Sequence, residues 1–408
     1  MKKPELLAPA GNLEKLKFAI LYGADAVYCG GHNYGLREGA DNFSLEELKE
    51  AVEFSHNNDS KIYVTVNMIP HNDDLIGIEE YLQQLEDIGV DALIISDPGI
   101  LRILQLEGIE IPVHLSTQAN AVNWASISFW QEQGVERIIL ARELSKDEIM
   151  EIRDKSSISL EMFIHGAMCI SYSGRCLLSN YMANRDANRG RCAHSCRWQY
   201  YLMEEQRPGE YYPIYEDESG THIMNSKDLC LINEIPDIIE TGVDSLKIEG
   251  RMKSLHYVST VTSVYRKALD TYLLDPQNYV FKEEWLAELR KVSHRDYTTG
   301  FFHRKPSAGD HNYQSSAYQR SYDFMGMVRQ YLPEESEAVI EVRHKFFKGD
   351  LVEIMGPGLK SFLNKIDYII SEDGEMVNEA PHPKELIRIP VSRPVKPYYI
   401  LRREKADE

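Results

Sequence analysis

The stretch ELLAPAGNLEKLKFAILYG, residues 5–23, sets the pattern on which the fold prediction rests. A short apolar run, ELLAPAG (5–11), is followed at once by NLEKLKFAILYG (12–23), whose apolar residues recur with the period of an amphipathic helix. The next apolar run, AVYCGG (26–31), is followed after a loop by a second helical pattern, SLEELKEAVEFSH (44–56). Strands that alternate with helices indicate a parallel sheet with helical crossovers.

Six further units of the same kind continue along the chain. Their strand candidates are 61–67, 92–97, 113–120, 137–144, 159–166 and 244–251, and each leads to an amphipathic stretch. Eight strand–helix units within residues 1–275 predict an α/β fold, a (β/α)8 TIM-like barrel, with a doubly wound open sheet as the structural alternative. Residues 166–225 form a cysteine-rich insertion directly after the seventh predicted strand.

The pattern changes after residue 275. Residues 276–323 are expected to form a connector that is irregular and partly helical. From 324 to 408, short strand candidates alternate with turn signals such as KGD (348–350) and EDGE (372–375). This part predicts a small all-β barrel domain, a kind that more often binds or positions a partner than carries out chemistry.

The composition limits the class of protein. The net charge is −19 and 43% of the residues are hydrophobic, enough for a sizeable core. No stretch approaches the ~20 apolar residues of a membrane span, and the start, MKKPELLAPAG, lacks the long apolar run of a signal peptide. We therefore expect no membrane partner and a cytoplasmic location. In a reducing compartment, clustered cysteines more often bind metal or catalyse reactions than form disulfides.

Four of the six cysteines lie close together, in GAMCISYSGRC (166–176) and RGRCAHSC (189–196). They are Cys169, Cys176, Cys192 and Cys196, separated by six, fifteen and three residues. Four converging thiolates are what an iron–sulfur cluster needs, and equally a structural zinc site with all-sulfur ligation. Structural zinc sites favour two short cysteine pairs, and only the second pair is short here. Inert buried cysteines are the third possibility.

The two remaining cysteines are interpreted as core residues. Cys29 lies in the apolar run AVYCGG, where a small side chain suits a strand. Cys230, in NSKDLCLINEI, falls at the expected start of a helix. Burial is favoured for Cys230, but it stays an alternative ligand for the cysteine site.

Several predicted strands carry polar residues at alternate positions. These are His114, Ser116 and Gln118 in one strand, Lys247, Glu249 and Arg251 in another, and Glu161 and His165 in a third. If helices cover the apolar side, the polar side points into the barrel. It would form either an internal salt-bridge network or a polar substrate pocket at the carboxyl ends of the strands. Together with Arg142, this side would form a polar mouth next to the cysteine window.

The cysteine window is basic although the chain as a whole is acidic. Residues 166–197 hold one acid, Asp186, and five arginines, Arg175, Arg185, Arg189, Arg191 and Arg197, which is a local charge of +4. Such a segment is either a docking surface for RNA phosphates or an ordinary solvated loop.

At these residues a known family becomes recognisable. EMFIHGAMCISYSGRCLLS (161–179) resembles the signature of peptidase family U32, E-x-F-x-x-G-[SA]-x-C-x4-G-x-C-x-[LIVM]-S. PELLAPAGN (4–12), NRGRCAHSCRW (188–198) and VDSLKIEGRMKS (243–254) extend the likeness over most of the chain, and the terminal β region resembles the family's C-terminal domain. Within the family, the sequence looks like the bacterial branch that hydroxylates the wobble uridine of tRNA in a prephenate-dependent reaction.

The resemblance implies a cofactor, partners and roles for residues. It implies a [4Fe–4S] cluster held by the four clustered cysteines, with Cys230 as the alternative ligand, and prephenate as co-substrate. The partners would be the tRNA anticodon region and a homologous U32 subunit. Arg142, Lys247 and Arg251 are the candidates for binding a small dicarboxylate, and Arg175 and Arg191 for binding RNA. His165, Glu249 and Gln118 are the catalytic candidates, the first two as proton carriers.

Two other functions stay open at this stage. The family name implies a peptidase, a hydrolase, yet the sequence has no HExxH zinc motif and no GxSxG elbow. A cysteine peptidase would use one of the clustered cysteines as its nucleophile. The third hypothesis is a tRNA-binding partner without enzymatic activity, against which the polar barrel lining argues.

Overall fold

The computed structural model of the 408-residue chain describes most of the barrel and the terminal β region up to residue 405. The described residues are 2–35, 41–169, 171–172, 175–193, 195, 202–203, 211–212, 215–217, 220–222, 227–305 and 318–405. Of the residues predicted to form a site, Cys196 lies outside these ranges.

Eight parallel strands close into a barrel. They are β1 (Glu5–Pro9), β2 (Ala26–Gly30), β3 (Lys61–Val66), β4 (Ala92–Ile95), β5 (Val113–Leu115), β6 (Arg137–Ile139), β7 (Ser159–Gly166) and β13 (Ser245–Ile248). Each strand pairs in parallel with the next, and β13 pairs with both β7 and β1, which completes the ring. The predicted (β/α)8 barrel is therefore confirmed, and the open-sheet alternative is wrong.

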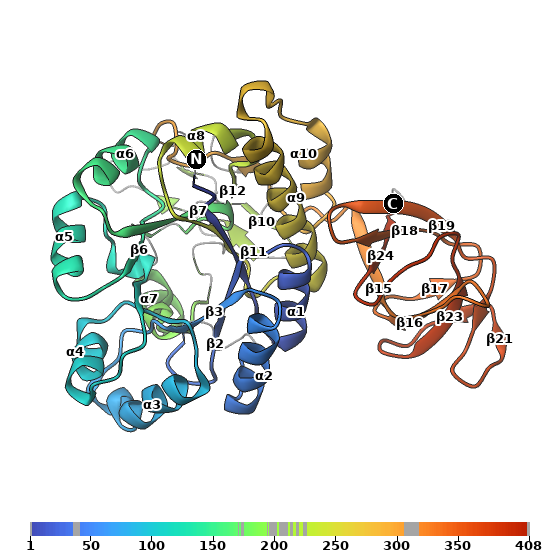
Figure 1. The fold of residues 1–408 in the computed structure, drawn as a ribbon, viewed down its shortest axis with the longest axis horizontal. Coiled ribbons are helices and arrows are strands. Elements are labelled where there is room, and N and C mark those ends of the chain that lie inside the picture. Colours follow the sequence, from blue (N-terminus) through green and yellow to red (C-terminus); the bar gives the residue numbers. More distant parts are fainter. Residues whose placement is uncertain are drawn as a thin grey trace.

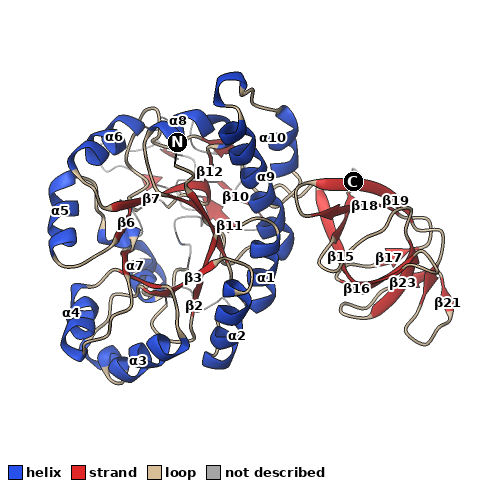
Figure 2. Ribbon diagram, in the orientation of Figure 1, coloured by secondary structure: helices blue, strands red, loops and turns tan. Residues whose placement is uncertain are grey.

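Helices surround this ring, as Figure 2 shows. They are α1 (Leu13–Leu21), α2 (Leu45–His56), α3 (Ile78–Ile88), α4 (Pro98–Glu107), α5 (Trp124–Glu132), α6 (Lys146–Lys155), α8 (Ile235–Glu240) and α9 (Leu255–Leu274). Several begin at a side-chain cap. Ser44 starts α2 and Ser145 starts α6, each within a reciprocal capping box that satisfies free backbone N–H groups. Among the described helices, none is both long and apolar enough to cross a lipid bilayer.

The insertion after β7 is held at both ends by the barrel sheet. It contains α7 (Leu178–Ala183) and the short strands β8 (Leu202–Met203), β9 (Tyr211–Tyr212), β10 (Tyr215–Asp217) and β11 (Gly220–His222). Its last strand, β12 (Asp228–Cys230), pairs antiparallel with the end of β7, where Leu229 lies opposite Gly166. The prediction that Cys230 begins a helix is thus wrong, because edge pairing with β7 extends this segment.

The segment 276–323 also contributes to the barrel. It contains α10 (Glu283–Leu289) and a two-residue strand, β14 (Tyr297–Thr298), which pairs in parallel with β12. The buried carboxylate of Asp228 accepts a hydrogen bond from the Arg295 backbone N–H (3.1 Å) beside this pairing. The expected connector is therefore partly integrated into the sheet.

The C-terminal region is all-β, as predicted. One antiparallel sheet contains β15 (Tyr322–Leu332), β16 (Glu337–Val342), β18 (Leu351–Gly356), β19 (Lys360–Lys365), β20 (Ile369–Ile370), β21 (Met376–Val377), β23 (Leu386–Pro390) and β24 (Ile400–Glu404). A smaller pair joins β17 (Phe346–Phe347) to β22 (Glu379–Ala380). The region has its own buried core, separate from the core of the barrel.

A third apolar cluster joins the two regions. Phe18 and Tyr22 of α1 and Leu255 of α9 are buried together with Met327, Met355 and Ile400 of the β region. The Tyr22 hydroxyl donates to the Tyr398 carbonyl (2.9 Å). Figure 1 shows the β region beside α1 and α9, on the outside of the barrel wall.

Candidate active site at the barrel mouth

The amino-terminal half of the barrel interior is filled by paired charges. Glu161 has no exposed surface and lies between Lys247 Nζ (2.9 Å) and Arg137 Nη1 (3.3 Å). Burial alone would raise the pKa of Glu161, but these two cations outweigh it and hold the pKa below its usual value. Arg137 also pairs with Glu5 (2.6 Å). The predicted internal salt-bridge network is therefore present, and Lys247 belongs to it.

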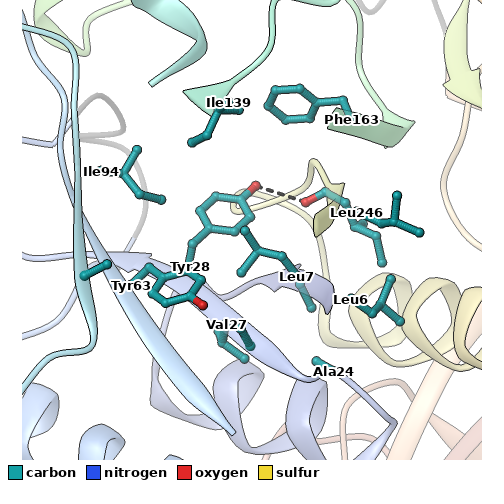
Figure 3. Close-up of a cluster of buried hydrophobic side chains, with 14 of the residues drawn as sticks. Leu6, Leu7, Ala24, Val27, Tyr28, Tyr63, Ile94, Ile139, Phe163 and Leu246 are labelled. Carbon is teal, nitrogen blue, oxygen red and sulfur yellow. Dashed lines mark hydrogen bonds between the residues drawn. The ribbon is translucent and has the colours of Figure 1, made fainter. Parts of the chain in front are cut away.

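Aromatic rings form the next layer of the interior. Lys247 Nζ lies 4.3 Å from the centre of the Tyr28 ring, and the Arg142 guanidinium lies 3.7 Å from the centre of the Phe163 ring. Figure 3 shows Tyr28, Ile139 and Phe163 facing one another from three strands. Cations over ring faces are electrostatically favourable, most of all where water is excluded. This layer separates the charge network from the carboxyl ends of the strands.

Arg142 and Glu249 meet at those carboxyl ends. Arg142 Nη2 lies 3.5 Å from Glu249 Oε2, and the Tyr28 hydroxyl donates to the same oxygen (3.4 Å). The backbone at Glu249 is fixed by its N–H, which donates to the His165 carbonyl (2.9 Å), and by the Tyr257 hydroxyl, which donates to its carbonyl (2.9 Å). The predicted mouth residues Arg142 and Glu249 are thus together and rigidly mounted.

Arg251 is buried beside this pair. It is 4% exposed, and its guanidinium donates to Asn42 Oδ1 (2.6 Å) and Thr65 Oγ1 (3.0 Å). The guanidinium packs against Gly30, where a Cβ would lie 2.4 Å from Arg251 Nη2, so a larger residue would displace the guanidinium. Arg251 is therefore held in one orientation against β2 and β3 by these contacts.

His165 lies elsewhere than expected. Its ring stands 5.5 Å from the rings of Tyr265 and Tyr297 and 5.9 Å from that of Tyr257, and its Nδ1 is 3.4 Å from the Tyr265 hydroxyl. Burial lowers the pKa of His165 to about 3. The expectation that it shares the barrel interior with Glu161 is wrong, because one extra residue bulges from β7 between the partners of Lys247 and Ile248. His165 therefore points toward α9.

Gln118 lies at the mouth, but on a turn. The extended strand β5 ends at Leu115, and Thr117–Ala119 form a 3₁₀ turn that the Ser116 hydroxyl caps by accepting from the Gln118 N–H (3.4 Å). The Gln118 carbonyl accepts a hydrogen bond from Arg175 Nε (3.1 Å), and Asn120 Nδ2 donates to the Tyr172 carbonyl (3.1 Å). The turn after β5 thus supports the loop that carries Cys169 and Cys176.

Three of the clustered cysteines are described, and they share one neighbourhood. Cys169 is exposed, Cys176 is buried and Cys192 is intermediate. Atoms packed around the sulfur raise the pKa of the Cys169 thiol, the thiols of Cys176 and Cys192 raise it further, and Arg142 lowers it. The three thiols and Arg142 therefore lie within electrostatic range of one another. The position of Cys196 lies outside the described residues.

Hydrogen bonds hold the cysteine segments to one another. Asn188 Oδ1 accepts from the Cys176 N–H (3.3 Å) and Asn188 Nδ2 donates to the Cys176 carbonyl (3.2 Å). The Asn188 carbonyl accepts from the N–H of Ile69, after β3 (3.2 Å). The Ala193 N–H, next to Cys192, donates to Ser179 Oγ (2.8 Å). Both cysteine segments are therefore tied to the barrel mouth through α7 and the turn that follows it.

The three described thiols do not form a compact three-sulfur set. Four sulfurs around one zinc at about 2.3 Å stand only about 3.8 Å apart. Among the described His, Cys, Asp and Glu residues, the one set of three or more with all ligand atoms within 4.8 Å is Glu234, Asp237 and His303. The sulfurs of Cys169, Cys176 and Cys192 therefore do not all lie within 4.8 Å of one another, and the choice between a zinc ion and an iron–sulfur cluster stays a prediction.

The other two cysteines are buried in the wall. Cys230 pairs with His165 across β12 and β7, and its sulfur lies 3.9 Å from the Tyr265 hydroxyl. Burial raises its pKa to about 11. Burial raises the pKa of Cys29, on β2, to about 12. Both positions agree with the interpretation of these residues as core, and whether Cys230 replaces one of the four ligands stays a prediction.

A cavity beside the mouth was not predicted from the sequence. It has a volume of about 690 Å³ and is lined by the loops after β2 and β3 and by the insertion. Its lining includes Tyr34, His71, Asp74 and Asp186, together with Arg191, one of the predicted substrate-binding residues. Only the rule that loops after barrel strands carry function could have indicated these residues.

Comparison with known proteins now identifies the family. A profile of peptidase family U32 matches residues 11–312, and a profile of the peptidase family U32 C-terminal domain matches residues 320–402. The chain belongs to peptidase family U32. The resemblance carried by the motif in 161–179 is thereby confirmed.

Relatives of this U32 chain include proteins named for RNA hydroxylation. A "tRNA hydroxylation protein P1" of Bacillus subtilis is 47% identical over 99% of this chain and 96% of its own length. A "tRNA hydroxylation protein P" of Escherichia coli is 39% identical over 98% of this chain and 96% of its own length. A "23S rRNA 5-hydroxycytidine C2501 synthase" of Escherichia coli is 40% identical over 66% of this U32 chain, which is 40% of that protein's length.

Proposed function

We propose that this U32 chain is a tRNA-modifying enzyme that hydroxylates C5 of the wobble uridine. The observation that carries the proposal is the cysteine loop docked over a charged barrel mouth, with Arg142 influencing the Cys169 thiol and pairing with Glu249. Near full-length relatives named for tRNA hydroxylation support the reaction and the substrate class. A relative named for hydroxylation of an rRNA cytidine supports C5 of a pyrimidine as the reacting atom.

We assign Cys169, Cys176, Cys192 and Cys196 as the ligands of a [4Fe–4S] cluster. The electrostatic influence of Cys176 and Cys192 on the Cys169 thiol supports this ligand set. A bound cluster would supply one-electron redox chemistry beside the mouth. The chain's own contribution is to hold the sulfurs in place, through Asn188 and Ser179.

Hydroxylation at C5 replaces a C–H bond by a C–O bond, an oxidation of the base by two electrons. The reaction therefore needs an oxygen source and an electron acceptor, and we propose prephenate as the oxygen source. A small dicarboxylate needs a cation at the mouth, and Arg142 is best placed, because Lys247 and Arg251 are committed to Glu161, Asn42 and Thr65. Glu249, next to Arg142, is the residue best placed to move a proton.

RNA would approach from the side of the insertion. Arg175 lies over the turn after β5, and Arg191 lines the cavity after β2 and β3. Both can contact phosphates of an anticodon loop, which gives a salt-dependent contribution to binding. A homologous U32 subunit is a further proposed partner.

The decisive experiment is nucleoside analysis of tRNA. Cells that lack this chain are expected to lose 5-hydroxyuridine and its derivatives, and the wild-type gene is expected to restore them. Cys176→Ala should not restore them, whereas Cys230→Ala should, if Cys230 is a core residue and not a ligand. Protein purified without oxygen should contain iron and sulfide. Unchanged tRNA in the deleted cells, or a colourless protein with stoichiometric zinc, would refute the proposal.

The geometry gives little support to a peptidase. In the described part of the chain, no histidine hydrogen-bonds to the thiols of Cys169, Cys176 or Cys192, and His165 is turned away under α9. A cysteine nucleophile needs a base within hydrogen-bond reach. A protease assay on Cys176→Ala and wild-type protein checks this point, and we expect no cysteine-dependent cleavage.

A further inference from the structure

The side-chain amide of Gln118, at the barrel mouth, has a carbonyl oxygen without a hydrogen-bond partner among the described residues. Its backbone is fixed on both sides, by the Ser116 hydroxyl at its N–H and by Arg175 at its carbonyl. Its side-chain oxygen, in contrast, is buried and has no hydrogen-bond partner among the described residues. A buried acceptor without a partner costs about 1–3 kcal/mol, so such an atom calls for a partner of its own, either an ordered water, an ion or a ligand.

A second amide in the same state lies next to it. Asn67 directly follows β3, and its Nδ2 donates to the same Ser116 hydroxyl (3.5 Å), while its carbonyl accepts from Ser96 Oγ (2.9 Å). Within the described ranges, the buried Asn67 Oδ1 also lacks a partner. Gln118 and Asn67 are therefore neighbouring amides, and each has a buried side-chain oxygen without a hydrogen-bond partner among the described residues. The backbone of both residues is held by hydrogen bonds.

Gln118 and Asn67 lie at the end of the barrel where the proposed reaction would take place. They follow β3 and β5 at the carboxyl end of the barrel, where the chemistry of this fold takes place. The loop with Cys169 and Cys176 is bonded directly onto the Gln118 turn through Arg175, and through Tyr172 to Asn120. A group bound to the amides would lie beneath that loop.

We infer that Gln118, with Asn67 beside it, reads the imide edge of a uracil base turned out of the RNA. This inference rests on the proposed function and names its specificity residues. An amide oxygen accepts from uracil N3–H while the amide NH₂ donates to the adjacent carbonyl, a two-bond match of the kind that side-chain amides make with bases. Single-stranded bases are read on this edge, and modifying enzymes take the base out of its stack.

The test measures binding of three anticodon-arm RNAs that differ at one base. They carry uridine, 3-methyluridine or cytidine at the wobble position, and binding is measured without oxygen to the metal-loaded protein at one salt concentration. The wild type should bind uridine about 10- to 100-fold more tightly than 3-methyluridine, in which a methyl group replaces the N3 proton. Gln118→Glu keeps the acceptor but loses the donor, so it should weaken uridine binding about 10-fold and raise the cytidine-to-uridine preference.

Gln105→Glu is the matched control. Gln105 lies on α4, donates to the Gln133 carbonyl (3.1 Å) and is exposed, so the same chemical change there should leave all three affinities unchanged. The comparison of uridine with 3-methyluridine uses only the wild type and does not depend on the folding of a variant.

The outcomes separate this inference from the proposed function. If the wild type binds 3-methyluridine as tightly as uridine, base reading by the amides is refuted, even where tRNA analysis shows that the chain makes 5-hydroxyuridine. Equal effects of Gln118→Glu and Gln105→Glu on the base preference would also refute it. Tighter wild-type binding of uridine than of 3-methyluridine, together with a higher cytidine-to-uridine preference in Gln118→Glu, would support base reading, even if the modification proved to be a different one.

Discussion

Glu161 is the buried carboxylate that neutralises Lys247 and Arg137 inside the barrel. It is fully buried between Lys247 and Arg137, and Lys247 has no other carboxylate at salt-bridge distance among the described residues. Removing one member of a buried charge set leaves the others without compensation. We expect Glu161→Gln to lower the free energy of unfolding by about 3–5 kcal/mol, measured by urea denaturation at neutral pH.

The pH dependence follows from the lowered pKa of Glu161. A carboxylate with a lower pKa in the folded state stabilises the protein above its unfolded pKa, and the effect is lost as the pH falls through the folded value. The gap between wild type and Glu161→Gln should therefore narrow below about pH 4.5. Glu151→Gln is the control: among the described residues, the one ion pair of Glu151 is with the exposed Lys155, so this substitution should cost less than 1 kcal/mol. Equal costs for the two variants would contradict the buried-pair argument.

For single residues, the sequence predicted which side chains lie at the barrel mouth more accurately than which partners those side chains contact. Arg142, Glu249 and Gln118 lie at the mouth as expected. Arg251 and Lys247 were expected to bind substrate, but they are committed to internal partners. Alternation along a strand shows which side a residue faces, but it does not show which neighbour neutralises its charge.

Among the elements, Gly166 joins β7 to the insertion in a conformation that only glycine adopts easily. Its φ is +112°, and a Cβ there would lie 2.6 Å from the Glu249 carbonyl oxygen. Gly166→Ala should therefore lower the free energy of unfolding by about 3 kcal/mol and disturb the Arg142–Glu249 pair. Urea denaturation measures the first effect, and the affinity for the anticodon-arm RNA measures the second.

Gly134→Ala separates backbone strain from the close contact. Gly134 has a φ of +89° with open space around its Cβ position, so its replacement should cost only about 1–2 kcal/mol. If the two alanine variants lost equal stability and bound RNA equally well, the contact with Glu249 would have no role.

The positions of the barrel strands were predictable from the sequence, but the carboxyl end of β5 and the side that His165 of β7 faces were predicted wrongly. All eight barrel strands lie within their predicted ranges. The prediction extended the strand at 113–120 past Leu115, because the sequence does not show that the Ser116 hydroxyl caps a turn. It also placed His165 on the side of Glu161, since a one-residue bulge leaves no mark on the hydrophobic pattern.

At the scale of the whole molecule, a buried arginine connects the β region to the barrel. Arg402 has no exposed surface and pairs with Glu353 (2.9 Å) of its own sheet and Glu288 (2.6 Å) of α10. Burial alone would raise the pKa of Glu353, but Arg402 and Lys291 outweigh it and lower the pKa to about 2. Nothing in the sequence indicated this contact, because its partners are far apart along the chain.

Acid should therefore weaken this junction. The contribution of Glu353 is complete above about pH 4.5, its ordinary range, and is lost as the pH falls toward 2. We expect Glu353→Gln to lower the melting temperature at pH 7 and to reduce its fall between pH 5 and pH 3, measured by calorimetry. Glu372→Gln, at an exposed turn of the same region, should follow the wild-type curve. Parallel curves for wild type and Glu353→Gln would contradict the pKa assignment.

The pairing of Gly166 with Leu229 has a consequence for the history and redesign of the chain. The insertion leaves and re-enters the barrel at directly opposed positions of two antiparallel strands, so its ends are already as close as the ends of a hairpin. Closing a long loop costs only slightly more entropy than closing a short one; for about sixty residues against four the difference is about 2 kcal/mol. We therefore expect that the whole insertion could be exchanged with that of a relative, or replaced by a tight turn, while the barrel keeps its fold.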